Sequence, residues 1–135
     1  MLLDTSGLLC LHHRAEPFHQ EACQAYRAAR TRLTHGYVLA EFVALAQARR
    51  LPRPEALEFV VDLVANPDIE TVWVDEALHH EAMALLRARP DKTYSLCDAI
   101  SFVLLRERSV HEALTTDRTS SRKAFASCWD RARWR

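Results

Sequence analysis

Four acidic residues stand at positions where a carboxylate could take part in chemistry. Asp4 and Asp117 each follow a short apolar run, and Glu41 and Asp98 each lie in the opening turns of an apolar helical segment. An ionisable side chain beside a buried element is costly unless it has a partner. These four carboxylates are therefore the candidate functional residues.

Each acid also has an ordinary structural explanation. Ser95-x-x-Asp98 before an apolar run resembles a capping box, and an acid there favours the positive end of the helix. Asp4 could cap the turn that follows it, Glu41 could be a solvated charge near a helix start, and Asp117 could be a turn residue. Each explanation suffices for one acid, but four acids in equivalent positions favour a shared role.

The spacing of apolar residues predicts the elements that position these acids. Strands are expected at residues 1–4, 32–35, 70–75 and 113–116, with a pair of helices between successive strands. In the helix from Pro54 to about Ala65, we expect Leu57, Val60, Val61 and Val64 to face inward. Helical crossovers between short strands imply a mostly parallel sheet with helices on both faces, a three-layer αβα fold. A single domain over residues 1–135 is expected.

In such a sheet the carboxyl ends of the strands and the starts of the following helices share one edge, where ligands bind. All four acids are predicted there. Like charges in proximity raise each other's pKa and destabilise the fold unless a cation intervenes. Lys or Arg side chains could supply that charge. A divalent ion such as Mg²⁺ or Mn²⁺, which prefers oxygen ligands, is the more specific explanation for a group of four carboxylates.

Composition limits the other classes of function. The chain has 135 residues, with 18 basic and 18 acidic side chains, so its net charge predicts neither a nucleic-acid nor a membrane partner. A local basic patch begins at Arg118. The four cysteines are scattered without zinc-ligand spacing, and we read them as reduced thiols of a cytoplasmic protein. No signal peptide or membrane-spanning run is visible.

Four segments carry a resemblance to a known family. They are Leu2-Leu-Asp-Thr-Ser6, Leu39-Ala-Glu-Phe42, Ser95-Leu-Cys-Asp-Ala-Ile-Ser101 and Leu114-Thr-Thr-Asp-Arg118. In this order they resemble the four motifs of PIN domains, and most of all the small bacterial ribonuclease toxins of the VapC type. Many relatives place His-Phe soon after the last Asp-Arg, whereas this chain has Thr119-Ser-Ser121.

The resemblance implies a function and a site. Asp4, Glu41, Asp98 and Asp117 would form an acidic quartet that binds one or two Mg²⁺ or Mn²⁺ ions, with Asp117 either a direct ligand or one acting through water. The activity implied is metal-dependent endoribonuclease cleavage of RNA phosphodiester bonds. The partners implied are a cognate antitoxin protein and a second copy of the chain in a homodimer.

Other residues are expected near that site. Ser6 and Thr116 could supply hydroxyls close to the metal, although hydrogen bonding at the strand ends explains them equally well. Arg118, Arg122 and Lys123 are candidates for contacts to RNA phosphates, with a solvated basic surface as the alternative.

Two other classes of function are alternatives to this reading of the sequence. A catalytically inactive PIN-like module that binds RNA or protein is the main alternative, and the intact acids argue against it. A phosphatase of the haloacid-dehalogenase type would need Asp-x-Asp after the first strand, whereas this chain has Asp4-Thr-Ser.

Overall fold

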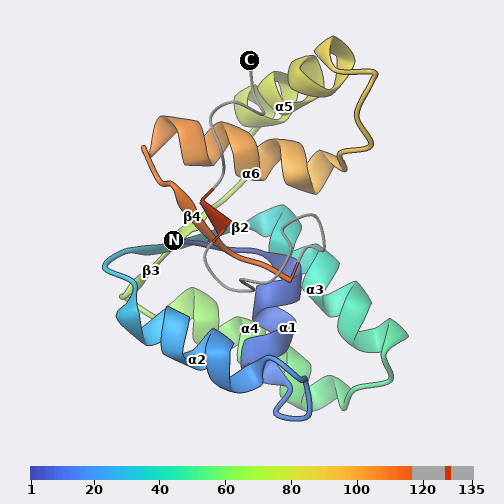
Figure 1. Ribbon diagram of the computed structural model, residues 1–135. Helices are drawn as coiled ribbons and strands as arrows, with labels where there is room; N and C mark the ends of the chain where they lie inside the picture. The colour runs from blue at the N-terminus through green and yellow to red at the C-terminus, as the bar shows by residue number, and fades with distance from the viewer. Residues whose placement is uncertain (117–126, 129–135) are drawn as a thin grey trace.

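The computed structural model describes residues 1–116 and 127–128. Within them, a pair of helices lies between each two successive strands of the first four, and the strands form one central sheet (Figure 1). The elements are β1 (Leu2–Leu3), α1 (Thr5–His12), α2 (His19–Ala28), β2 (Arg32–His35), α3 (Gly36–Ala48), α4 (Arg53–Ala65), β3 (Ile69–Val72), α5 (Glu76–Ala88), α6 (Leu96–Glu107), β4 (Glu112–Leu114) and β5 (Ser127–Cys128).

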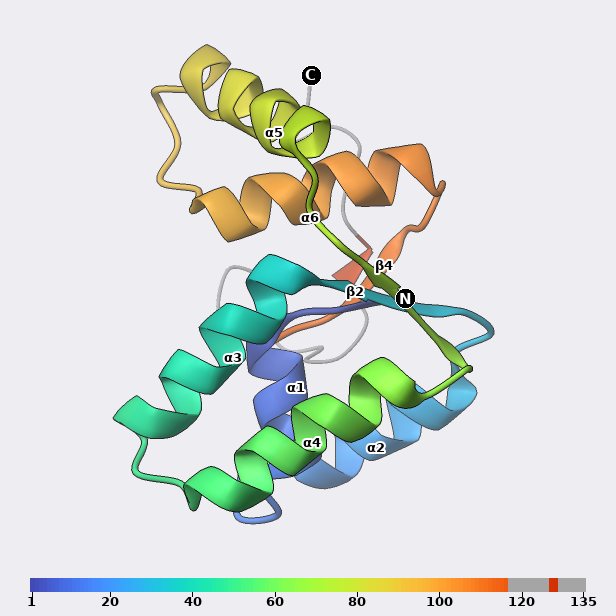
Figure 2. The ribbon, with the colours of Figure 1, turned by 180° about the vertical axis from the view of Figure 1, so that it is seen from behind.

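The sheet has the strand order β3-β2-β1-β4-β5. The first four strands in this order are parallel, and β5 is antiparallel to β4. Helices α1 to α4 cover one face and α5 and α6 cover the other, as the view from behind in Figure 2 also shows. The predicted three-layer fold with a mostly parallel sheet is confirmed, and the edge strand β5 is an addition to it.

Strand β1 shows how so short a sheet holds two helical layers. Leu2 and Leu3 are both fully buried. Leu3 packs with the cluster from α1 to α4, and Leu2 packs with the cluster under α5 and α6. Successive side chains of a strand point to opposite faces. Each leucine therefore anchors one layer, and burying each one contributes roughly 1.5–3 kcal/mol.

Helix α1 crosses the end of β4 at a very short distance. A Cβ atom on Gly7 would lie 2.1 Å from the backbone oxygen of Leu114. Only a residue without a side chain allows this approach, which brings the first turn of α1 against the residues that follow β4.

Helix α4 departs from the prediction. Leu57, Val61 and Val64 are 38%, 58% and 37% exposed, while Ala56 and Leu63 are buried. The helix carries two apolar stripes, and only one can face the core. The expectation that Leu57, Val61 and Val64 face inward was therefore wrong. No helix in the described residues is long and apolar enough to cross a membrane.

Candidate metal centre

Asp4 lies at the carboxyl end of β1 and is the residue preceding α1. Its backbone N–H donates to the oxygen of Leu114 at 3.2 Å, which extends the β1–β4 ladder by one step. Its side chain makes no capping bond to the helix. Instead, Oδ2 accepts a hydrogen bond from the Thr115 hydroxyl at 3.2 Å.

The Thr115 hydroxyl is part of a short chain of hydrogen bonds. The backbone N–H of Thr116 donates to Ser6 Oγ at 2.9 Å, and Ser6 Oγ lies 3.2 Å from Thr115 Oγ1. A hydroxyl has a single hydrogen, and that of Thr115 goes to Asp4. The Ser6 hydroxyl must then donate to Thr115. The order Thr116 N–H, Ser6, Thr115, Asp4 follows, and it holds one carboxylate oxygen of Asp4 in place.

Two of these residues were expected at the site from the sequence, and the third was missed. Ser6 contributes its hydroxyl to this chain of hydrogen bonds. The contribution of Thr116 among the described contacts is its backbone N–H, and the hydroxyl on Asp4 comes from Thr115. Thr115 could have been predicted from the alternation of side chains along β4 only if the register of β1 against β4 were known. The pair Leu3–Leu114 sets that register and places Asp4 opposite Thr115.

Asp98 occupies the third position of α6 and caps that helix. Its Oδ2 accepts from the backbone N–H of Ser95 at 3.0 Å, and its own N–H donates to Ser95 Oγ at 3.0 Å. The interpretation of this segment as a capping box is confirmed. Oδ1 of Asp98 accepts no hydrogen bond from any described residue. One oxygen therefore serves the helix, and within the described part of the chain no hydrogen bond occupies the other.

Glu41 lies in the second turn of α3 and is exposed. It is a neighbour of Cys97, the residue before Asp98. The pKa of the Cys97 thiol is raised, first by burial and then by the charge of Glu41. Cys97 is 8% exposed and belongs to the core. A buried thiol that keeps its proton is a poor nucleophile, which agrees with the sequence interpretation of Cys97 as a core residue.

The three acids interact electrostatically. The pKa of Asp4 is raised to about 6, mainly by burial; the charges of Asp98 and Glu41 also raise it, against hydrogen bonds from the Thr5 backbone and the Thr115 hydroxyl. No ion pair among the described residues involves Asp4, Glu41 or Asp98. The fold thus brings three carboxylates together without a basic partner in the part of the chain that it describes.

The remaining predicted site residues lie outside the described residues. They are Asp117, Arg118, Arg122 and Lys123.

The donor set fits a hard divalent cation. Three carboxylates offer the oxygen ligands that Mg²⁺ and Mn²⁺ prefer, and a bound cation would remove the repulsion that raises the pKa of Asp4. In their present conformation, no three His, Cys, Asp or Glu side chains of the described residues converge closely enough to enclose an ion. Binding would therefore require these carboxylates to draw closer together, as mutually repelling groups do around a cation.

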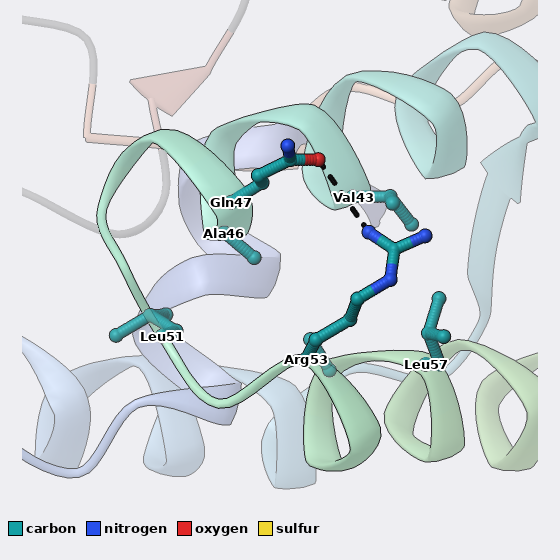
Figure 3. Close-up of a pocket in the computed structure, with 7 residues that line it drawn as sticks. Val43, Ala46, Gln47, Leu51, Arg53 and Leu57 are labelled. Atoms are coloured by element: carbon teal, nitrogen blue, oxygen red, sulfur yellow. Dashed lines mark hydrogen bonds between the residues drawn. The ribbon is translucent and has the colours of Figure 1, made fainter.

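A separate pocket lies between α3 and α4, with a volume of about 80 Å³. Figure 3 shows Arg53 reaching across it to donate from Nη1 to Gln47 Oε1 at 3.4 Å. Its lining consists of Val43, Ala46, Gln47, Leu51, Arg53, Ala56 and Leu57. None of these is an acid, so this pocket is not the metal centre.

The protein is of the α/β class: a parallel sheet lies between two helical layers, with acids at its carboxyl edge and at the helix starts. The sequence belongs to the PIN domain family, which it matches over residues 1–126. No curated protein matches it significantly.

Solved structures share this fold. Mycobacterium tuberculosis VapC20, described as a toxin that cleaves the sarcin-ricin loop, superimposes with a TM-score of 0.78 at 22% identity, over 87% of this chain and 90% of that one. A chain of a toxin–antitoxin complex from Klebsiella pneumoniae gives a TM-score of 0.58 at 18% identity, over 87% of each chain. At these identities the likeness concerns the fold.

Proposed function

We propose that this protein is a Mg²⁺- or Mn²⁺-dependent endoribonuclease and the toxin of a toxin–antitoxin pair. The observation that carries the proposal is the grouping of Asp4, Glu41 and Asp98 at the carboxyl edge of the sheet, with no basic partner among the described residues. Membership of the PIN domain family, and a fold shared with the VapC20 toxin and with a chain of a toxin–antitoxin complex, support it.

In this proposal the acids hold the cation and orient the attacking water. Asp4 is steadied through Oδ2 by Thr115, and Asp98 through Oδ2 by Ser95, so each would offer its other oxygen to the ion. Glu41 and Asp117 would complete the site. When bound, the divalent ion would polarise the scissile phosphate, lower the pKa of the water and stabilise the leaving oxygen.

RNA affinity must come from groups other than the acids, because carboxylates repel a phosphate backbone. We assign this role to Arg118, Arg122 and Lys123, which follow the last acid in the sequence.

The experiment that tests the catalytic assignment exploits the two roles of Asp98. Asp98→Asn keeps an oxygen that can accept from the Ser95 N–H but removes the charge. We expect it to lower Mn²⁺-dependent RNA cleavage on the order of 100-fold, as loss of a transition-state electrostatic group does. Ser95→Ala is the matched control: it costs about 1 kcal/mol of stability through the lost cap and leaves cleavage close to that of the wild type. Unchanged cleavage by Asp98→Asn would refute the assignment.

The exposed stripe of α4 is our candidate surface for the antitoxin. Leu57, Val61 and Val64 follow the spacing i, i+4, i+7, so they lie on one side of the helix, and Leu57 also lines the pocket beside α3. A chain of this fold is part of the toxin–antitoxin complex from K. pneumoniae, which supports an antitoxin as the partner.

Expression in bacteria tests the toxin role and this surface together. We expect growth arrest that is relieved by the antitoxin encoded next to the gene. Val61→Glu should still arrest growth but escape the antitoxin, whereas Glu58→Gln, an exposed change on the same helix, should remain neutralised. Absence of arrest by the wild type would argue against a toxin.

A homodimer also belongs to the proposal. Trp73 follows β3 and is 64% exposed, although its ring packs against Gly36. A tryptophan this exposed is typical of an interface. Light scattering should show a dimer for the wild type and a shift toward monomer for Trp73→Ser; an unchanged dimer would place the contact elsewhere.

A further inference from the structure

A buried polar pair links the N-cap residue of α3, the helix that carries Glu41, to α6, the helix that carries Asp98. His35 is 0% exposed and Ser101 is 3% exposed. The His35 ring nitrogen Nε2 lies 2.8 Å from Ser101 Oγ. The other ring nitrogen, Nδ1, accepts the backbone N–H of Val38 at 3.4 Å and so caps α3. Because Nδ1 accepts, the hydrogen belongs on Nε2, and the ring donates to Ser101.

The pair lies close to both acids along the chain. Ser101 follows Asp98 by three residues, about 4.5 Å along α6, and His35 precedes Glu41 by six residues, about 9 Å along α3. Helices α3 and α6 belong to opposite layers of the sheet, and their first turns approach each other at its edge (Figure 2). The hydrogen bond thus connects the two layers near the starts of α3 and α6.

The contact is uncharged. Burial is the cause that lowers the pKa of His35, to about 4, so the ring is neutral at physiological pH. A buried apolar pair of the same shape would hold the helices together with equal or greater stability. A hydrogen bond differs because it is directional, and it therefore specifies one distance and one orientation between the helices.

We propose that His35 and Ser101 are positioning residues that fix how α3 and α6 hold the backbones of Glu41 and Asp98, from which the two side chains close on a divalent cation. This inference rests on the proposed function, because it gives the pair a role at the same site. Neither residue contacts RNA in this proposal, and both act through the carboxylates that their helices carry.

Mn²⁺ titration calorimetry on the full chain tests the proposal, with His35→Asn, Ser101→Ala and the double variant. His35→Asn retains an oxygen that can cap α3 but is too short to reach Ser101. We expect each single variant to weaken Mn²⁺ binding about tenfold, the lower end of the loss seen when supporting hydrogen bonds of a metal site are removed. The double variant should bind no worse than the weaker single one, because both changes break the same bond.

Two controls separate positioning from general loss of stability. Ile69→Val removes one buried methyl at the opposite end of the sheet and should leave Mn²⁺ affinity unchanged. The electron paramagnetic resonance spectrum of bound Mn²⁺, which reports the symmetry of its ligands, should change in Ser101→Ala and remain as in the wild type in Ile69→Val.

The outcomes distinguish this inference from the proposed function. If Asp98→Asn binds Mn²⁺ as the wild type does, the metal site itself is refuted, and the inference falls with it. If Asp98→Asn loses binding but His35→Asn and Ser101→Ala bind as tightly as Ile69→Val, the metal site stands and the positioning role is overturned.

Discussion

The hydroxyl of Thr115 donates a hydrogen bond to Asp4 Oδ2 across 111 residues of sequence, at 3.2 Å. Thr115 is 7% exposed, and its oxygen is also within 3.2 Å of Ser6 Oγ. This bond stabilises the ionised form of a carboxylate whose pKa is raised by burial. The pKa of Asp4 therefore depends on how the start of α1 packs against the end of β4.

Replacing Thr115 by valine should raise the pKa of Asp4 above its value of about 6, because a bond to the ionised form is lost. Carbon-13 NMR titration of the Asp4 carboxyl carbon measures the shift, and Mn²⁺ affinity should fall with it. Thr115→Ser retains the hydroxyl and should restore both values. A pKa unchanged in Thr115→Val would show that the hydroxyl does not act on Asp4.

Replacing Asp4 by asparagine should stabilise the metal-free protein at neutral pH. The pKa of Asp4 is about 6 when folded and 3.8 in the reference state, so its burial in the charged form costs up to roughly 3 kcal/mol above pH 6. That cost disappears as the pH falls from 6 to below 4, where the acid is protonated in both states. Urea unfolding in EDTA should therefore show a gain for Asp4→Asn at pH 7.5 and none at pH 3.5.

Mn²⁺ should stabilise the wild type but not Asp4→Asn. It should raise the unfolding midpoint of the wild type, since it binds the folded state, and leave that of Asp4→Asn unchanged. Equal stabilisation of both proteins would contradict a role for Asp4 as a ligand.

His35 should make the wild type less stable in acid. The pKa of His35 is lowered from 6.5 to about 4 by burial, so between these values the unfolded chain takes up a proton that the folded chain resists. The stability associated with the neutral ring is complete above pH 6.5 and falls by up to roughly 3 kcal/mol as the pH drops to 4.

A comparison of variants isolates this effect from the opposite effect of Asp4. His35→Asn should be less stable than the wild type at pH 7, and its stability should fall less steeply between pH 6.5 and 4. The comparison should be repeated in the Asp4→Asn background, where the competing titration is absent. Parallel pH profiles for the two proteins would mean that His35 is not buried as a neutral ring.

Gly7→Ala should destabilise the fold by at least about 1–3 kcal/mol, the usual cost of overpacking. The added Cβ would lie 2.1 Å from a backbone oxygen, which cannot move without disturbing β4. Gly36→Ala is the matched control, because its Cβ would meet the Trp73 ring at 3.3 Å and that ring is largely exposed. Thermal unfolding compares the two, and equal losses would mean that α1 does not approach β4 so closely.

The sequence by itself determined the order of the elements and the edge at which the acids meet. Apolar runs of strand length alternate with helical periodicity, and helical crossovers leave a parallel sheet as the consistent arrangement. Asp4 and Asp98 could then be placed at one edge, because an acid that ends a strand and an acid that starts a helix share it. The capping box at Ser95 was also readable, since its partners are only three residues apart.

Tertiary structure alone decided which neighbour supports each acid. The choice of Thr115 over Thr116 depends on the register of two strands that are distant in the sequence, and a shift of one residue exchanges them. Which of the two apolar stripes of α4 is buried depends on which side of the helix packs against the core. The bond from His35 to Ser101 spans 66 residues and two layers. Local spacing encodes periodicity within one element, whereas these contacts arise from packing between elements, which no single segment specifies.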